Sequence, residues 1–153
     1  MAADILVVHH SRGGETARLT EEVLSGAEEA RGALSVTLLD AFAAGPDDVL
    51  EARGVILGTP ARFGYMSGAM KDFLERIYHP CLERALRRPF ALYVKGDSDI
   101  TGAVESVERI VRGLGWKRVL PVLEVVGAIQ PPDLEAAHDL GATMAAGIES
   151  GIF

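Results

Sequence analysis

The sequence predicts an α/β protein with a parallel sheet that is covered by helices on both faces. Short β-branched runs alternate with helical patterns along the chain, and parallel strands need such crossover segments between them. The central runs are apolar almost throughout, which is typical of strands that are buried on both faces. A length of 153 residues fits one domain, so we expect a single domain over residues 1–153.

The predicted strands are the five runs 4–8 (DILVV), 34–39 (LSVTLL), 54–59 (GVILGT), 90–94 (FALYV) and 118–126 (RVLPVLEVV). Strands joined by right-handed crossovers favour an open doubly wound sheet. Ligands of such sheets bind beyond the carboxyl ends of the strands, where the strand order reverses. The loops at 9–16, 59–66 and 95–102 are therefore the predicted binding loops.

Apolar residues at helical spacing predict the crossover helices. The first helix carries an apolar stripe from Ala17 to Ala30, and one or two helical turns are expected to start near Pro46. Ser67 is predicted to cap the third helix, and glycines end the fourth. Prolines at 131 and 132 open the last helix, whose small residues between 141 and 147 are expected to let it lie close to the sheet.

Composition argues against several functions. A net charge of -7 disfavours nucleic acid as a partner. The N-terminus has no basic region followed by a long apolar stretch, and no run approaches the roughly 18 apolar residues of a membrane span, so we expect a cytoplasmic protein without membrane contact. Cys81 is the only cysteine and is predicted to be an inert, partly buried thiol, while four scattered histidines predict no metal site.

The first binding loop belongs to the stretch HHSRGGETARL, residues 9–19. Its hydroxyls and glycines stand between a strand and a helix, where backbone N–H groups and the helix dipole favour an anion such as phosphate. The loop has neither the Gly-Lys-Ser/Thr of a Walker loop nor Gly-x-Gly-x-x-Gly, and it lacks the cysteine and arginine of a phosphatase. Because these catalytic motifs are missing, we predict that the loop holds a phosphate without transferring it. The alternative is a glycine-rich turn that binds no ligand.

The second loop and the helix after it read GTPARFGYMSGAMKDFLERIY, residues 58–78. A flat heterocycle can lie against its proline-fixed backbone while an aromatic ring or a guanidinium packs on one face. Arg62, Phe63 and Tyr65 are the side chains of these kinds. The two aromatic residues have a second interpretation, as surface or interface residues.

Together, these two loops resemble those of a known family. Ser11-x-x-Gly14-x-Thr16 after the first strand resembles the flavodoxin phosphate loop, and GTPARFGYMSGAMKDFLE, residues 58–75, is similar to the flavin loop of flavodoxin-like NAD(P)H:quinone oxidoreductases. The order of the predicted strands and helices agrees with that of the family along nearly the whole chain. The resemblance implies a flavodoxin-like three-layer sandwich with a five-stranded parallel sheet of order 2-1-3-4-5, and it implies FMN as the cofactor.

The resemblance also implies a set of cofactor-binding residues in the three loops. Around the phosphate it places Ser11, Arg12, Gly13, Gly14, Glu15 and Thr16, along the isoalloxazine ring Thr59, Pro60, Ala61, Arg62, Phe63 and Gly64, and in the third loop Lys95, Gly96 and Asp97. No catalytic acid or base is expected, because flavin carries the redox chemistry itself.

The third loop departs from the family. KGDSDITGA, from Lys95, replaces a glycine-rich loop and lacks the tyrosine with which electron-carrier flavodoxins cover the outer flavin face, so we infer an open face. Asp97 and Asp99 either add negative charge near the ring or form a solvated turn, in which Asp99 or Thr101 caps the fourth helix. The chain is also shorter than typical quinone oxidoreductases of this kind.

An open flavin face leaves room for a nicotinamide and then for a quinone. We therefore predict an FMN-dependent NAD(P)H oxidoreductase of the quinone or flavin reductase type, with a quinone or another flat molecule as acceptor. The alternatives are an electron carrier or flavin-binding module without nicotinamide turnover, and a flavodoxin fold that has lost FMN.

Several residues outside the loops remain open to more than one interpretation. His10 is expected to be a packed strand-end residue or a contact of the ribityl chain, and His138 to face solvent or to approach a flavin of a neighbouring subunit. His79 is predicted to lie in a loop, and Trp116 to cover a sheet edge. Exposed aromatic and arginine residues of kinds enriched at interfaces favour a homodimer, with a tetramer as the alternative.

Overall fold

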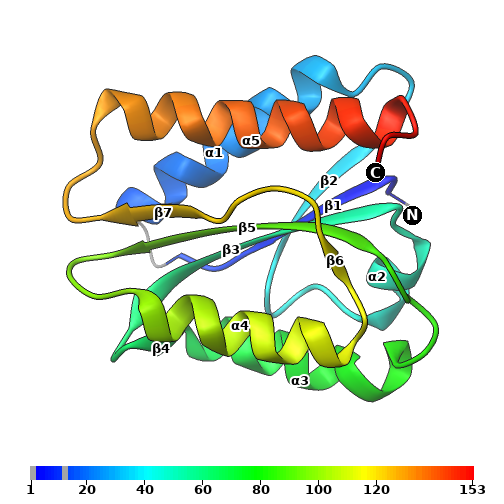
Figure 1. Ribbon diagram of the computed structural model, residues 1–153, viewed down its shortest axis with the longest axis horizontal. Coiled ribbons are helices and arrows are strands. Elements are labelled where there is room, and N and C mark those ends of the chain that lie inside the picture. The colour runs from blue at the N-terminus through cyan, green and yellow to red at the C-terminus, as the bar shows by residue number, and fades with distance from the viewer. Residues whose placement is uncertain (1–2, 12–13) are drawn as a thin grey trace.

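The computed structural model describes residues 3–11 and 14–153. In chain order the described elements are β1 (Ile5–His9), α1 (Glu15–Ala30), β2 (Val36–Asp40), α2 (Pro46–Glu51), β3 (Gly54–Arg62), β4 (Tyr65–Met66), α3 (Gly68–Cys81), β5 (Pro89–Gly96), α4 (Thr101–Gly113), β6 (Lys117–Arg118), β7 (Leu123–Val126) and α5 (Pro131–Glu149). They form a twisted sheet between two helical layers, with α1 and α5 on one face and α3 and α4 on the other (Figure 1).

The parallel strands follow the order β2-β1-β3-β5-β6, which confirms the predicted order 2-1-3-4-5 when strands are numbered as the sequence suggests. The fifth predicted run is divided into β6 and β7, which both pair with β5. Pro121 lies between them and has no N–H to donate to the ladder, which accounts for the break. The short strand β4 was not predicted and pairs antiparallel with β3.

Alternating side chains of the central strands build two apolar cores. Along β1, Ile5 and Val7 face the core beneath α1 and α5, whereas Leu6 and Val8 face the core beneath α2, α3 and α4. Each of these four side chains is at most 1% exposed. The sheet is therefore buried on both faces, as the apolar runs predicted.

Helices α1 and α5 touch through their backbones. A Cβ atom at Gly141 would lie 2.0 Å from the carbonyl oxygen of Val23, and one at Gly26 would lie 1.9 Å from that of His138. The prediction that small residues of the last helix serve close packing on the sheet is thus wrong for Gly141, which faces α1. The glycines let the two helices approach more closely than any larger residue would permit.

Helix α3 runs further than the sequence predicted. Its apolar face continues from Ile77 to Cys81, both fully buried, so His79 and Pro80 belong to its last turn. The prediction that His79 lies in a loop is therefore wrong, because burial of Cys81 one turn after Ile77 extends the helix. Burial also raises the pKa of the Cys81 thiol.

Trp116 is buried, and its ring lies 6.0 Å from that of Phe90 between centroids, as expected for a residue that covers the sheet edge. The longest described helix is α5, with 19 residues. Among the helices of residues 3–11 and 14–153, none combines the length and apolar character needed to cross a membrane.

Candidate functional site

Loops from three strands meet at the carboxyl edge of the sheet, around a cavity of about 250 Å³. The chain moves to β2 on one side of β1 and returns to β3 on the other, so the strand order reverses between β1 and β3. This is the position at which open α/β sheets bind ligands. The lining brings together Gly14, Glu15 and Thr16, then Pro60, Ala61 and Arg62, and finally Lys95, Gly96 and Asp97.

A larger cleft of about 690 Å³ shares Arg62 with this cavity. It is lined by Phe63, Tyr65 and the start of α3, and also by His10 and Phe42. Its volume is in the range of small-molecule sites. The two adjoining spaces suit a ligand with an anionic end and a flat apolar part. The sequence did not single out Phe42, although its place just after β2, at the same edge of the sheet, was a usable signal.

The start of α1 has features that favour binding of an anion. Gly14 precedes the first helical residue with φ of 77°, and it has no side chain that could cap the helix. The N-cap residue therefore gives the first N–H groups of α1 no side-chain acceptor, and the helix dipole favours negative charge there. Ser11 is half-buried. The predicted phosphate contacts Arg12 and Gly13 lie outside the described residues.

A buried hydrogen-bond chain anchors the first turn of α1 to the sheet. The Thr20 hydroxyl donates to the carbonyl oxygen of Thr16 at 3.2 Å and lies 2.6 Å from the Tyr93 hydroxyl on β5. Tyr93 is fully buried, and its burial raises its pKa. Gly58 on β3 makes room for the Tyr93 ring, since a Cβ there would lie 1.9 Å from it. The predicted phosphate contact Thr16 is therefore positioned by residues that the sequence did not reveal.

The second loop is a β-hairpin. Arg62 pairs with Tyr65, and the two residues between them, Phe63 and Gly64, have φ of 52° and 70°. Positive φ at both central residues is the pattern of a two-residue type I′ turn. Phenylalanine rarely adopts this conformation, and the Phe63 side chain is fully exposed at the tip. The hairpin thus presents Arg62 and Phe63 to the larger cleft.

Thr59 supports this hairpin from within. Its side chain is fully buried, its hydroxyl accepts a hydrogen bond from the Ser67 N–H at 3.0 Å, and it donates to the carbonyl oxygen of Pro60 at 2.8 Å. Ser67 caps α3 as predicted, because its Oγ accepts from the Met70 N–H at 3.1 Å. The structure therefore gives the Thr59 side chain a role in holding the loop, and its predicted place along a flavin ring stays a prediction.

Helix α4 holds the hairpin from outside. The Met66 N–H donates to Ser106 Oγ at 3.3 Å. A Cβ at Gly102 would lie 2.0 Å from the carbonyl oxygen of Gly64, so the tip rests directly on the first turn of α4. The backbone of the hairpin tip is consequently held by a helix that begins almost forty residues later in the chain.

The third loop lies against the second and begins α4. A Cβ at Gly96 would lie 2.9 Å from that of Ala61, which shows how closely the loops approach. Asp99 accepts a hydrogen bond from the Thr101 N–H at 2.9 Å, and this bond lowers the pKa of Asp99. The N-cap residue of α4 is Ile100, which makes no side-chain capping bond, so the prediction that Asp99 or Thr101 caps this helix is wrong; Asp99 bonds the first helical residue from the position before the cap. Lys95 lies 3.1 Å from both Glu15 and Asp97.

Two histidines, His10 and His138, each lie beside a carboxylate. His10 Nδ1 lies 3.6 Å from Asp40 Oδ2, and the His10 ring packs edge-on against Phe42, so His10 is a packed strand-end residue that lines the larger cleft. Burial lowers the pKa of its neighbour His9, although Asp40 opposes this shift. His138 Nε2 lies 3.0 Å from Glu29 Oε2, which links α5 to α1. In the described part of the chain no three acidic, histidine or cysteine residues are grouped so that they could hold a metal ion.

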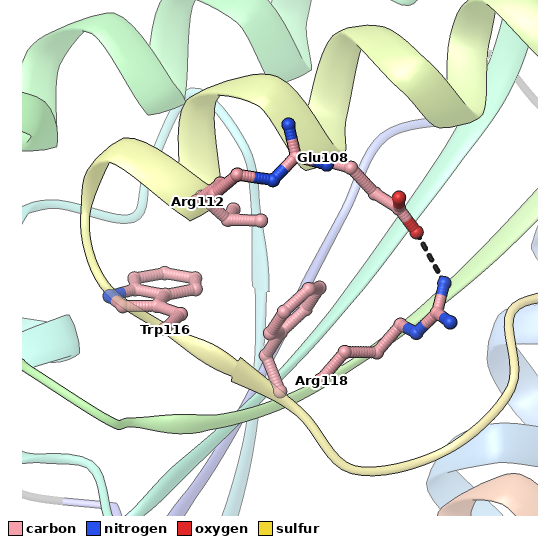
Figure 2. Close-up of a pocket in the computed structure, with 6 residues that line it drawn as sticks. Glu108, Arg112, Trp116 and Arg118 are labelled. Carbon is pink, nitrogen blue, oxygen red and sulfur yellow. Dashed lines mark hydrogen bonds and ion pairs between the residues drawn. The ribbon is translucent and has the colours of Figure 1, made fainter.

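A separate pocket of about 250 Å³ lies beside β6, as Figure 2 shows. Trp116 and Phe90 form its apolar part, and an ion pair joins Arg118 to Glu108 across its rim. Since β6 pairs with Pro89–Phe90 at the amino end of β5, this pocket is remote from the loops at the carboxyl edge. None of the predicted site residues lines it.

Comparison with known proteins places this geometry in context. No protein-family model matches the chain. An NAD(P)H dehydrogenase (quinone) from Acidithiobacillus ferrooxidans is 34% identical over 91 residues, which cover 47% of this chain and 46% of that protein. The chain thus spans about half the length of the curated relatives it matches.

Solved structures match over almost the whole chain. A flavodoxin from the domain Archaea superposes with a TM-score of 0.82 at 18% identity, covering 97% of this chain and 99% of that one. A WrbA-like flavodoxin from Agrobacterium tumefaciens gives a TM-score of 0.79 at 23% identity, with coverage of 97% and 98%. The fold is therefore flavodoxin-like, as predicted. Within that class, the chain is a flavodoxin-like protein that resembles quinone oxidoreductases.

Proposed function

We propose that the chain is an FMN-binding oxidoreductase that takes electrons from NAD(P)H and passes them to a quinone or another flat acceptor. The observation that carries the proposal is the convergence of the α1 N-terminus, the hairpin and the Lys95–Asp97 segment around one cavity at the reversal of strand order. The likeness to NAD(P)H dehydrogenases (quinone) supports the reaction class.

The described residues fit FMN at both ends. The N-terminus of the sixteen-residue helix α1 and the Lys95 ammonium supply partners for a phosphate in the smaller cavity. Arg62 and Phe63 supply a guanidinium and an aromatic ring at the larger cleft, where a flat ring system packs. In the proposal, the six residues of the first loop hold the phosphate, the backbone of 59–64 lies along the ring, and residues 95–97 contact the part of the cofactor that occupies the smaller cavity.

FMN supplies the electron transfer itself, so the chain has to bind the flavin, orient it and leave a face accessible. The residues after Gly96 are Asp97, Ser98 and Asp99, all exposed and none aromatic. They offer no ring to cover a flavin. A nicotinamide and then an acceptor can in this arrangement use the same face in turn, with the exposed Phe63 at the mouth of the cleft.

The test begins with FMN titration of the purified protein, followed by quenching of flavin fluorescence, with riboflavin alongside. We expect FMN to bind much more tightly than riboflavin. Ala61→Leu, which fills the space between the second and third loops, should abolish binding, whereas Ala146→Leu on the exposed side of α5 should leave it unchanged. Failure of the unmodified protein to bind FMN at micromolar concentration contradicts the proposal.

Anaerobic mixing of the FMN-loaded protein with NADH or NADPH then tests the enzyme. Bleaching of the oxidised flavin spectrum by either nucleotide supports it, and lack of reduction by both contradicts it. The archaeal flavodoxin match, which covers almost all of both chains, favours a second candidate, an electron carrier without nicotinamide turnover. Reduction by a protein donor alone would identify that candidate.

The proposal extends to domain organisation, location, partners and oligomeric state. We expect one domain over 1–153, a cytoplasmic location and a homodimer or tetramer, with neither nucleic acid nor membrane as partner. The exposed aromatic residues Phe42, Phe63 and Tyr65, which gather around the larger cleft, support an interface between subunits. Sedimentation velocity of the purified protein measures the oligomeric state directly.

A further inference from the structure

Lys95 is an unusual residue in the smaller cavity because its side chain is only 9% exposed, whereas lysines are almost never buried without a partner. Tyr93 and Lys95 stand two residues apart on β5, so both side chains point to the face that α1 covers. The Lys95 ammonium accordingly reaches the first turn of α1, where its Nζ lies 3.1 Å from Glu15 Oε2.

The second partner of Lys95 is Asp97, whose Oδ1 also lies 3.1 Å from Nζ. The two carboxylates differ in their surroundings. The Glu15 side chain is 41% exposed and belongs to a helix, whereas the Asp97 side chain is 98% exposed and belongs to the loop after β5. Asp97 can exchange Lys95 for water at little cost to its own solvation, because its carboxylate is almost fully exposed and is hydrated whether or not Lys95 is its partner. Lys95 therefore has one fixed partner and one that is easily replaced.

We propose that Lys95 makes this site selective for a phosphomonoester, whose phosphate displaces Asp97 from the Lys95 ammonium while Glu15 stays paired. In the protein without ligand, the Asp97 carboxylate thus occupies the place of the ligand's phosphate beside Lys95. The inference rests on the proposed function for the identity of the ligand as FMN, and it assigns the selectivity of the site to a residue that departs from the glycine-rich third loop of the family.

The electrostatics of the cavity require such a cation. Glu15 carries a negative charge in the first turn of α1, beside the N–H groups that would receive a phosphate, and unpaired it would repel the ligand. Lys95 neutralises Glu15 and still has a donor for the phosphate, since an ammonium has three. Burial by itself would lower the pKa of Lys95, but hydrogen bonds and charges from Asp97 and Glu15 outweigh it and raise that pKa. Lys95 thus stays charged at neutral pH.

The experiment compares four proteins, namely the unmodified chain, Lys95→Gln, Asp97→Asn and Asp99→Asn, in titrations with FMN and with riboflavin. Asp99→Asn is the matched control, because it removes the same charge two residues away from a carboxylate that bonds Thr101 instead of Lys95. We expect Lys95→Gln to weaken FMN binding about tenfold or more and riboflavin binding less than about twofold. Asp97→Asn should tighten FMN binding about threefold or more, and Asp99→Asn should change it by less than about twofold.

Two results overturn the inference: FMN affinity that is unchanged in Lys95→Gln, or affinities for FMN and riboflavin that fall together. Asp97→Asn binding FMN no more tightly than Asp99→Asn overturns the displacement of Asp97. Two controls separate loss of the charge from loss of the fold. The variants should give the same circular dichroism spectrum as the unmodified protein, and Lys95→Arg should recover the affinity for FMN.

A measurement with inorganic phosphate separates this inference from the proposed function. Phosphate should raise the melting temperature of the unmodified protein more than chloride does at equal ionic strength, and Lys95→Gln should remove the difference. If flavins fail to bind but this effect is present, the flavin function is wrong and the Lys95 anion site stands. If phosphate and chloride act alike on the unmodified protein, the anion site is wrong, whatever the flavins do.

Discussion

The hydrogen bond between Tyr93 and Thr20 leads to a prediction about non-additive stability. The Thr20 hydroxyl already donates to the carbonyl oxygen of Thr16, so Tyr93 is the donor in the 2.6 Å contact. Both residues are almost completely buried, at 0% and 3% exposure. Removing the donor and removing the acceptor therefore have different consequences.

Tyr93→Phe removes one hydrogen bond and leaves the Thr20 hydroxyl with its acceptor, so it should lower the free energy of unfolding by about 1 kcal/mol. Thr20→Val keeps the shape but leaves the buried Tyr93 hydroxyl without a partner, which should cost about 2 kcal/mol. In the double variant both polar groups are replaced by apolar ones of similar shape, and we expect a loss of about 1 kcal/mol rather than the sum.

Urea unfolding of the four proteins at pH 7, followed by circular dichroism, measures these differences in a double-mutant cycle. The slope of the free energy against urea should stay constant, which verifies that the variants unfold as the parent does. A double variant that loses the full sum of the two single effects, or a Tyr93→Phe that costs more than Thr20→Val, would refute this reasoning.

Other predictions concern the hairpin tip, the helix contact and alkaline pH. Phe63→Asn places a residue that tolerates positive φ in the type I′ turn and should raise the free energy of unfolding in urea by about 1 kcal/mol; a decrease contradicts the turn assignment. Gly141→Ala forces a Cβ against the Val23 carbonyl and should cost about 1–3 kcal/mol, whereas Gly68→Ala, with open space around it, should cost nothing; equal losses would argue against the close approach. Burial raises the pKa of Tyr93 above its ordinary value of 10.0, so its contribution to stability is complete below pH 10 and is lost as the pH rises further. The melting temperature should accordingly fall above pH 10, by less in Tyr93→Phe than in the parent, and identical pH profiles would contradict the assignment.

The fold was largely predictable because its signals are local. The central strands β1, β3 and β5 contain continuous apolar runs, and two helices begin at residues typical of helix starts, namely Ser67 before α3 and Pro131 in α5. The extension of α3 to Cys81 was missed because Pro80 suggests an end to the helix, and only burial of Cys81 shows that the apolar face continues.

The candidate site was predictable in its loops and not in its internal geometry. Glycines and hydroxyls after β1 indicated an anion site, and the order of the strands brought the other two loops to it. The type I′ hairpin escaped prediction because phenylalanine seldom occupies its first position. Phe42 was missed because its only signal in the sequence is its position directly after β2, and no neighbouring motif strengthens that signal.

The sequence by itself determined the alternation of strands and helices, the apolar faces and the three loops with unusual residues, since periodicity and turn chemistry act within a few residues. Only the tertiary structure decided which distant groups became partners. The Tyr93 and Thr20 hydroxyls are 73 residues apart in the chain, and Lys95 meets Glu15 only because β5 ends beside the start of α1. Such contacts depend on how elements cross the sheet, where one residue of displacement turns a side chain to the opposite face.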